Sequence, residues 1–234
     1  MKFGPALVRP IILTIFLIVL AGFAINLHLI TLPPHYDPFT PPELNDKPYW
    51  LTSTKLKSLD NDPESCSVAF AKAGIEAVVL PRVEHGRACV LEDTIVLRKF
   101  SHASIHAEQT RCNIAARLYM WERHVVQPAA RKYFGQRVKE ITHFGSYSCR
   151  TIRRAHNMSE HATANAFDIS GLRLADGRMI SILKAWDGNG YDAEFLHDVR
   201  NGLCDYFNLT LSPDYNIDHA DHFHVDMGRV RSCR

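Results

Sequence analysis

Two short stretches, far apart in the chain, carry the side chains best suited to hold a metal ion. In residues 159–168, His161 and Asp168 stand seven positions apart among small residues, and residues 218–226 contain three histidines and three aspartates. Zinc in hydrolytic enzymes takes three protein ligands from imidazole and carboxylate groups and keeps a fourth position for water. One histidine and one aspartate from the first stretch and one histidine from the second would meet this requirement.

The first stretch needs an element that turns Asp168 away from the hydrophobic core. A strand over residues 164–170 would do so, because side chains alternate between the two faces of a strand. Asp168 would then share its face with small residues such as Ala166 and Ser170, which leave room for a metal ion and a substrate. His161 would lie in a loop that folds back towards the carboxylate.

The second stretch shows the same alternation over residues 222–227. It puts His222, His224 and Asp226 on one strand face, with apolar residues between them on the other. If His224 is a ligand, His222 stands beside the bound water as a candidate base or as a stabiliser of the oxyanion. His219, off the strand, could reach the same pocket from the preceding loop.

The rest of the folded part indicates a mixture of strands and helices. Short runs rich in β-branched residues or alternating in polarity predict strands, and apolar residues at helical spacing predict helices. The expected strands cover residues 75–80, 94–97, 138–147, 166–172 and 222–227; the expected helices cover 110–134, with a kink or break at Pro128, and 191–207. Asp176-Gly177 is a hairpin turn signal. No regular βαβ alternation is present, so we expect an α+β domain with a mainly antiparallel sheet and flanking helices.

The N-terminal part of the chain predicts export. Residues 11–32 are almost uninterrupted apolar sequence preceded by Lys2 and Arg9, which fits a secretory signal or a membrane-spanning helix with its basic end inside. The apolar run is long for a cleaved signal, so an uncleaved anchor over residues 1–32 is the preferred interpretation. Prolines recur after it, which predicts an extended tether over 33–59 and a folded domain over 60–234.

Cysteine content and charge narrow the class of protein further. Six cysteines, all after the apolar run, form no Cys-x-x-Cys pair, so three disulfides are expected in an oxidising compartment. Pairing of near neighbours gives Cys66 with Cys89, Cys112 with Cys149 and Cys204 with Cys233. A net charge of +2 without a basic stripe argues against a nucleic-acid partner.

Taken together, the motifs resemble a known family. His161, Asp168 and the run His219-x-x-His222-x-His224 are similar to the zinc peptidase superfamily that contains D-alanyl-D-alanine carboxypeptidases, murein endopeptidases, lysostaphin-type enzymes and the hedgehog signalling domain. More closely, the chain from about Cys66 to Cys233 resembles the bacterial extensin-like C-terminal domain family. The marks of this resemblance are Gly145-Ser-Tyr-Ser-Cys-Arg150, Ser159-Glu-His-Ala, Ala166-Phe-Asp-Ile, Pro213-Asp-Tyr-Asn and His219-Ala-Asp-His-Phe-His-Val-Asp226.

The resemblance implies roles for individual residues. It implies zinc bound by His161, Asp168 and His224, with His222 as the counterpart of the second active-site histidine of murein endopeptidases and His219 as that of their upstream histidine. The resemblance also implies a fold like that of the hedgehog domain or the D-alanyl-D-alanine carboxypeptidases.

Other polar residues near these motifs receive expectations of their own. The resemblance implies that Arg150 orients a substrate carbonyl or carboxylate, although one extra residue precedes it here. Asp221 stands where the carboxypeptidase branch has a glutamate, but on an undistorted strand it faces away from His224, so His222 is the preferred base. Asp221 remains the alternative base if the chain bends before the strand starts. Asp218 and Asp226 are expected to fix imidazole tautomers. Glu160 is expected to face solvent or to cap.

The function that the resemblance implies is hydrolysis of the cell wall. We expect a zinc metallopeptidase, anchored by one helix in the bacterial inner membrane and facing the periplasm, that cleaves amide bonds in peptidoglycan cross-links or stem peptides. Endopeptidase and carboxypeptidase activity both remain open. The alternative is a non-catalytic module that binds peptidoglycan or a protein on the same fold.

Overall fold

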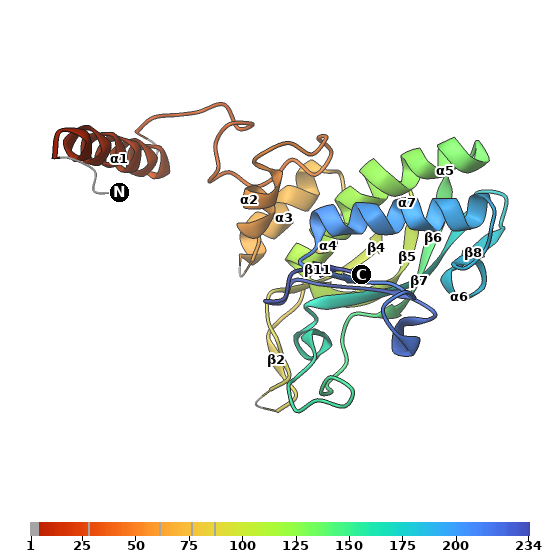
Figure 1. Cartoon of the computed structure of the whole chain (residues 1–234). Coiled ribbons are helices and arrows are strands. Elements are labelled where there is room, and N and C mark those ends of the chain that lie inside the picture. Colours follow the sequence, from red (N-terminus) through yellow and green to blue (C-terminus); the bar gives the residue numbers. More distant parts are fainter. Residues whose placement is uncertain (1–4, 28, 61, 76, 87) are drawn as a thin grey trace. The chain divides into compact units, whose positions relative to one another are not determined.

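The computed structural model describes residues 5–27, 29–60, 62–75, 77–86 and 88–234 (Figure 1). Within it the chain divides into two compact units, Met1–Thr40 and Pro41–Arg234. The first contains helix α1 (Pro5–Asn26), of which Val8–Asn26 has a mean hydropathy of 2.5. This helix is long and apolar enough to cross a membrane, a property that an N-terminal signal sequence shares. Arg9 lies in α1, and Lys2 lies outside the described residues.

The second unit begins earlier than the proline content indicated. Residues 41–59, assigned to the tether by their sequence, include a short helix α2 (Thr52–Lys57) and buried leucines, among them Leu44, Leu56 and Leu59. These leucines belong to the same core as the sheet and the later helices. Burial of apolar side chains therefore holds this segment on the domain, and the remaining tether is correspondingly shorter.

Nine of the described strands form one sheet, in the order β1-β4-β5-β6-β7-β10-β9-β11, with β8 paired to β7. Their bounds are β1 (Val78–Val79), β4 (Thr94–Lys99), β5 (Ser104–Arg111), β6 (Val138–Gly145), β7 (Ala166–Leu174), β8 (Met179–Ser181), β9 (Leu209–Leu211), β10 (Phe223–Asp226) and β11 (Ser232–Cys233). Only the pairs β5–β6 and β9–β11 are parallel. Strands β2 (Val83–Glu84) and β3 (Val90–Leu91) form a separate hairpin. The expected α+β fold with a mainly antiparallel sheet is confirmed.

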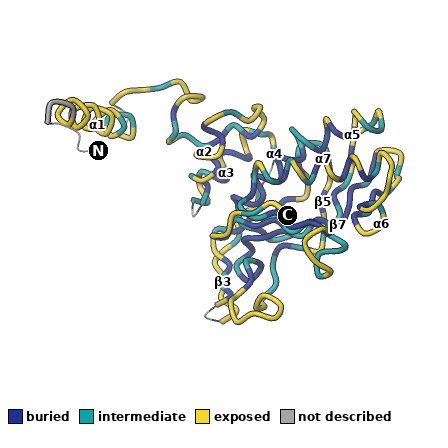
Figure 2. Tube along the Cα trace, in the orientation of Figure 1, coloured by how far each residue is buried: buried dark blue, intermediate teal, exposed yellow. Residues whose placement is uncertain are grey.

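The longer helices cover one face of this sheet (Figure 1). They are α3 (Pro63–Lys72), α4 (Cys112–Trp121), the π-helix η1 (Glu122–Val126), α5 (Gln127–Phe134) and α7 (Tyr191–Tyr206). The four-residue helix α6 (Ile182–Ala185) packs beside β8 and α7. The core lies between helices and sheet, where buried residues concentrate (Figure 2). Two short 3₁₀-helices, η2 (Glu160–Thr163) and η3 (Ile217–His219), lie in loops. The opposite face of the central strands is therefore open to loops and solvent.

Most predicted elements are present with small shifts of their ends. The strands expected over 94–97, 138–147, 166–172 and 222–227 correspond to β4, β6, β7 and β10, and the helix over 191–207 corresponds to α7. The helix expected to start at residue 110 starts at Cys112, because residues 110 and 111 complete strand β5. The helix is interrupted at Glu122 rather than at Pro128, which lies in the first turn of α5. Of the strand expected over 75–80, Val78–Val79 forms β1.

The disulfide pairing differs from the near-neighbour prediction in two of three bonds. Cys204–Cys233 is confirmed, whereas Cys66 pairs with Cys112 and Cys89 pairs with Cys149. Cys66 lies in α3 and Cys112 begins α4, and these helices pack on each other. The cysteines therefore pair according to which elements pack together, and not according to which cysteines are nearest in sequence.

Candidate metal centre

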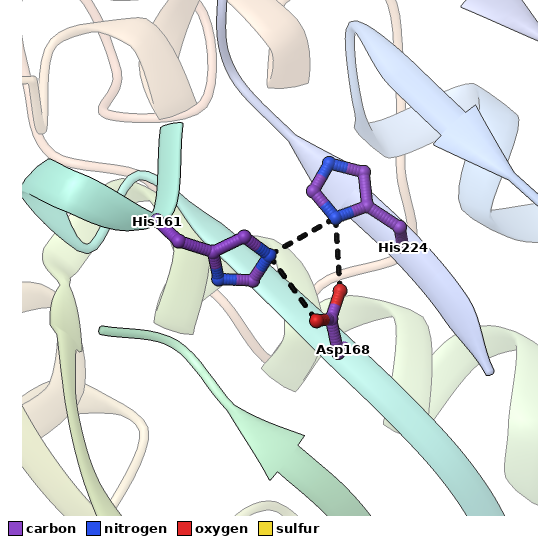
Figure 3. Close-up of side chains that lie close together, drawn as sticks. All are labelled: His161, Asp168 and His224. Carbon is purple, nitrogen blue, oxygen red and sulfur yellow. Dashed lines mark hydrogen bonds and ion pairs between the residues drawn. The ribbon is translucent and has the colours of Figure 1, made fainter. Parts of the chain in front are cut away.

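Asp168 and His224 are brought together by the register of two neighbouring strands. Strands β7 and β10 are antiparallel, and His224 lies directly opposite Asp168 in the ladder. Their neighbours along the two strands, Phe167 in β7 and Val225 in β10, are buried in the core on the helix-covered face. Both polar side chains therefore project from the open face, as Figure 3 shows. The alternation read from the sequence is confirmed for this part of both strands.

His161 reaches the same point from the short helix η2. The side chain of Ser159 caps this helix by accepting from the backbone N–H of His161 at 3.3 Å. Ala164 ends it in a left-handed conformation (φ 53°), and β7 starts two residues later. The buried imidazole donates its Nδ1–H to the backbone oxygen of Ser146 at 2.8 Å, which turns Nε2 towards Asp168 and His224.

The three donor atoms have the mutual spacing of metal ligands. His161 Nε2 lies 3.1 Å from His224 Nδ1 and 3.2 Å from Asp168 Oδ2, and His224 Nδ1 lies 2.8 Å from Asp168 Oδ1 (Figure 3). Around zinc, ligand distances of about 2.0–2.2 Å separate neighbouring ligand atoms of a tetrahedron by about 3.3–3.6 Å. An outward shift of a few tenths of an ångström would accommodate the ion.

Hydrogen bonds behind the two imidazoles decide which ring nitrogens face inward. Asp226 Oδ2 lies 3.1 Å from His224 Nε2 and can accept only from an N–H there, so a neutral His224 keeps its lone pair on Nδ1. The Ser146 carbonyl imposes the same logic on His161, with the lone pair on Nε2. Two lone pairs and a carboxylate then converge, which requires a cation between them, either a proton or a metal ion.

Charge in the metal-free protein agrees with this reasoning. Burial would by itself lower the pKa of His224, but hydrogen bonds to Asp168 and Asp226 outweigh it and raise that pKa to about 9. Burial would raise the pKa of Asp168, yet the hydrogen bonds from His161 and His224 hold it well below its usual range. A proton therefore stands where these residues could hold a metal ion, and the residues fit zinc by donor type and by spacing.

His222 precedes strand β10 but still faces the three residues. Its Nε2 lies 3.6 Å from Asp168 Oδ1, and its Nδ1–H donates to Asp221 Oδ1 at 2.8 Å. The ring of Phe144, from the end of β6, stands edge-on to it with 5.7 Å between ring centroids. Asp221 also precedes the strand, so strand alternation does not apply to it, and through this hydrogen bond it orients His222.

His219, the last residue of η3, lies beside the other two histidines of its segment. Its ring centroid is 5.2 Å from that of His222 and 5.9 Å from that of His224. Burial and the neighbouring His222 and His224 lower the pKa of His219 to about 4, so the ring is neutral near pH 7. The structure thus gathers the three candidate histidines of the C-terminal segment around Asp168.

Two other expectations are not met by the structure, those for Asp218 and Glu160, and the role expected of Arg150 stays a prediction. Arg150 is exposed at the base of a small hairpin closed by the Thr151–Met158 bridge, and among the described residues it makes no side-chain hydrogen bond or ion pair. Asp218 forms an ion pair with Arg153 instead of supporting an imidazole. Glu160 accepts from the Asn165 amide at 2.6 Å, half-buried, so it neither faces open solvent nor serves as a cap.

Sequence reasoning missed the part that Ser146 takes in the site. This residue is buried, and its hydroxyl donates to the backbone oxygen of Ala166 at 2.7 Å while its own carbonyl holds His161. Ser146 thereby couples the end of β6 to the start of β7 and to η2. The motif Gly145-Ser-Tyr-Ser-Cys-Arg150 had marked the position, but Arg150 drew the functional interpretation.

Comparison with known proteins places the chain in a family. Searches of curated proteins and of solved structures found no significant match. The family model described as extensin-like protein C-terminus matches residues 64–234, which include all the strands of the sheet and every residue of the candidate centre. The chain therefore belongs to the extensin-like protein C-terminus family.

Proposed function

We propose that this domain is a zinc-dependent hydrolase that cleaves amide bonds in peptidoglycan cross-links or stem peptides. The observation that carries the proposal is the convergence of His161 Nε2, His224 Nδ1 and the Asp168 carboxylate within 4.8 Å, with the outer imidazole nitrogens engaged elsewhere. One carboxylate and two imidazoles leave a fourth position open, which is the pattern of catalytic rather than structural zinc sites.

The neighbouring residues have the chemistry that amide hydrolysis needs. Zinc held there would polarise the scissile carbonyl and lower the pKa of a coordinated water towards about 7. His222 takes a proton from the attacking water through Nε2, because its Nδ1–H is engaged by Asp221 and its Nε2 faces Asp168. Arg150, exposed on the hairpin at the rim, would orient a carboxylate of the peptide after a change of side-chain conformation.

Location supports a cell-wall substrate. Three disulfides among the described cysteines favour an oxidising compartment, and α1 could anchor the chain in a membrane. We infer an inner-membrane protein of a bacterium whose domain faces the periplasm, where peptidoglycan is accessible. The similarity of the His/Asp pattern to zinc peptidases of the cell wall supports this substrate class.

The test combines metal content with product analysis. His161→Ala and His224→Ala should each lose stoichiometric zinc, whereas His222→Ala should keep zinc and lose cleavage of defined muropeptides by at least about 100-fold. His156→Ala, on the exposed hairpin beside the site, is the matched control and should change neither property. Full muropeptide cleavage by chelator-treated, metal-free protein would contradict the proposal. Zinc-dependent binding to sacculi without any cleavage would support the non-catalytic alternative.

A further inference from the structure

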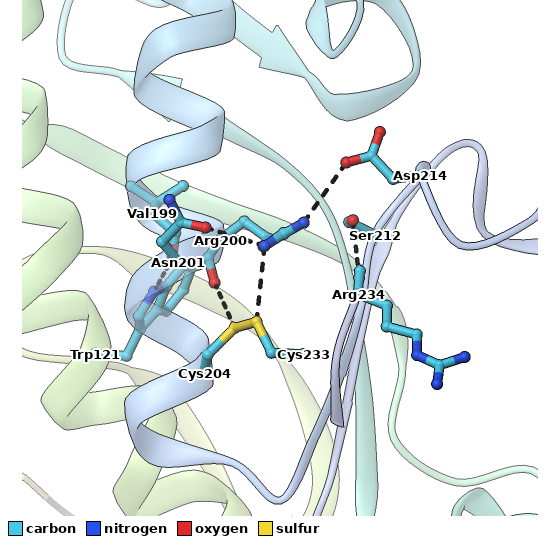
Figure 4. Close-up of a disulfide and its surroundings, with 9 residues drawn as sticks. All are labelled: Trp121, Val199, Arg200, Asn201, Cys204, Ser212, Asp214, Cys233 and Arg234. Atoms are coloured by element: carbon cyan, nitrogen blue, oxygen red, sulfur yellow. Dashed lines mark hydrogen bonds and ion pairs between the residues drawn. A yellow bond between two sulfur atoms is a disulfide. The ribbon is translucent and has the colours of Figure 1, made fainter. Parts of the chain in front are cut away.

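The loop that precedes η3 is tied to the core at its base. Asp214 accepts from the indole N–H of Trp186 at 2.8 Å and lies 3.5 Å from the guanidinium of Arg200 in α7. Figure 4 shows Arg200 between Asp214 and the Cys204–Cys233 disulfide, where it contacts Cys233 Sγ at 3.6 Å. The motif Pro213-Asp-Tyr-Asn therefore starts from a fixed point on the helical layer.

The C-terminal strand fixes the other side of the loop. The backbone N–H and the hydroxyl of Ser212 both donate to the backbone oxygen of Arg234, at 2.8 and 2.9 Å. Figure 4 shows this pair close to Asp214. Two independent attachments, one to α7 and one to the end of the chain, thus determine where Asn216 emerges two residues after Asp214.

The side chain of Asn216 determines the hydrogen-bond state of His219. Its Oδ1 accepts from the backbone N–H of Asp218 at 3.0 Å and lies 2.7 Å from His219 Nδ1. Because a backbone N–H points at this atom, it is the amide oxygen and not the nitrogen, so an amide flip is excluded. An oxygen 2.7 Å from Nδ1 requires a proton on Nδ1, and neutral His219 therefore has its lone pair on Nε2.

We propose that Asn216 is a positioning residue: its amide oxygen holds His219 in the Nδ1–H tautomer and so presents Nε2 to the substrate as a hydrogen-bond acceptor. This inference rests on the proposed function, since it assigns His219 a role in the same site. Tyr215, with its ring centroid 5.5 Å from that of His219, packs against the imidazole and limits its rotation.

His222 and His219 have hydrogen-bond partners of different charge, which suits the two histidines to different roles in the site. Asp221 gives His222 a carboxylate partner and supports a base that gains a proton, whereas Asn216 gives His219 a neutral one. His219 is thus suited to accept an N–H from the peptide substrate without being protonated. The helix cap on Asp218 is a second task of the same oxygen, and the experiment must separate the two tasks.

The experiment records the tautomer directly, in full-length, zinc-loaded protein labelled with ¹⁵N-histidine in detergent micelles. Long-range ¹H–¹⁵N correlation spectra distinguish Nδ1–H from Nε2–H, and the His219→Ala spectrum assigns the signals. Asn216→Ser keeps an N-cap oxygen but is too short to reach the ring, and Asn216→Asp keeps both contacts. Asn216→Ala removes both.

We expect wild type and Asn216→Asp to show the Nδ1–H tautomer, and Asn216→Ser and Asn216→Ala to lose it. In muropeptide cleavage, Asn216→Ser should lower kcat by about tenfold or more at normal zinc content. An Nε2–H tautomer in wild type, or an unchanged tautomer in Asn216→Ser, would overturn the proposal. If the tautomer responds as expected but no variant cleaves muropeptides, the proposed function fails and the positioning role stands.

Discussion

Single hydrogen bonds behind the imidazoles decide which ring nitrogens of His161 and His224 face the proposed metal position. The carboxylate of Asp226 is nearly buried; one oxygen accepts from His224 Nε2 and the other from the backbone N–H of Gly228, at 3.1 and 2.8 Å. Neither contact touches the metal position itself. The side chain is therefore a way to change the tautomer of His224 without removing a ligand.

Asp226→Asn should weaken zinc binding while leaving the fold in place. The asparagine oxygen can keep the Gly228 contact, which turns its NH₂ group towards His224 Nε2. His224 Nε2 must then accept a hydrogen bond from this NH₂ group. The ring proton of His224 therefore moves to Nδ1, where it blocks the lone pair that faces the proposed metal position. Substitutions of this kind typically cost about 10–100-fold in metal affinity. Competition with a chromophoric chelator measures the change.

Asp187→Asn serves as the control, because Asp187 is exposed and lies in a loop away from the centre. It should bind zinc as tightly as the wild type. An Asp226→Asn protein with unchanged zinc affinity would show that the tautomer of His224 is set by something other than Asp226.

Among the elements, the π-helix η1 shows how tightly the helical layer is packed. It begins at the buried Glu122, whose carboxylate accepts from the backbone N–H groups of Ser101 and Ala103 in the turn between β4 and β5, at 3.0 and 3.1 Å. The extra residue of a π turn lets this carboxylate reach the turn. Val125, in the same turn of η1, packs against Gly202 of α7.

Gly202→Ala should destabilise the protein although alanine is the better helix former. An added Cβ would lie 2.5 Å from Val125 Cγ1 and 2.9 Å from Cγ2, and a β-branched side chain has little freedom to move away. Overpacking costs about 1–3 kcal/mol, against a gain of about 1 kcal/mol in helix propensity. The free energy of unfolding in a denaturant series measures the net loss.

Two further variants identify the cause of that loss. Asn201→Ala, on the exposed side of the same turn, should change stability by no more than about 0.5 kcal/mol. In the double variant with Val125→Ala, the effect of Gly202→Ala should disappear or reverse in sign, since the clashing methyl groups are gone. Equal destabilisation in both backgrounds would locate the strain elsewhere.

Patterns within one element were readable from the sequence, and pairings between elements were not. Strand β10 and helix α7 have one apolar face, so their alternation or helical spacing predicted them. Strand β5 escaped notice because six of its eight residues, Ser-Ile-His-Ala-Glu-Gln-Thr-Arg, are polar or charged, and its alternation is weak. Disulfides depend on how α3 meets α4 and how the β2–β3 hairpin meets Cys149, which no local pattern contains.

The same division holds for the candidate site. His161, Asp168 and His224 were selected by residue type and spacing, together with a family resemblance. Ser146 was missed because its contribution is a backbone oxygen, and any residue type supplies one. The proposed role of Asn216 depends on a loop whose path is set by the contacts of Asp214 with Trp186 and Arg200, which lie outside every motif singled out in the sequence. Groups that position ligands are visible only in three dimensions.

At the scale of the whole molecule, the folded domain starts earlier in the chain than the segment that the family model matches. The family model starts at residue 64, but residues from Pro41 onward belong to the compact unit. The segment 41–59 also supplies partners to core helix α4: the backbone oxygen of Leu56 accepts from Arg117 at 3.4 Å, and Asn45 accepts from the Tyr119 hydroxyl at 2.9 Å. Without it, a buried guanidinium and a buried phenol lose hydrogen bonds.

A chain of residues 41–234 should therefore fold on its own, whereas a chain of residues 60–234 should not. The shorter chain lacks Leu44, Leu56 and Leu59, each at most 2% exposed. Burying one leucine contributes about 1.5–3 kcal/mol, so the three account for about 5–9 kcal/mol, comparable with the whole stability of a typical domain. Near-ultraviolet circular dichroism and thermal unfolding of both chains measure whether each chain folds and how stable it is.

Leu56→Ala in the longer chain should lower the free energy of unfolding by about 2–5 kcal/mol, which would show that the stability is lost through packing rather than through chain length. If the 60–234 chain unfolds at the same temperature as the 41–234 chain, residues 41–59 add nothing to the core and the tether extends to residue 59.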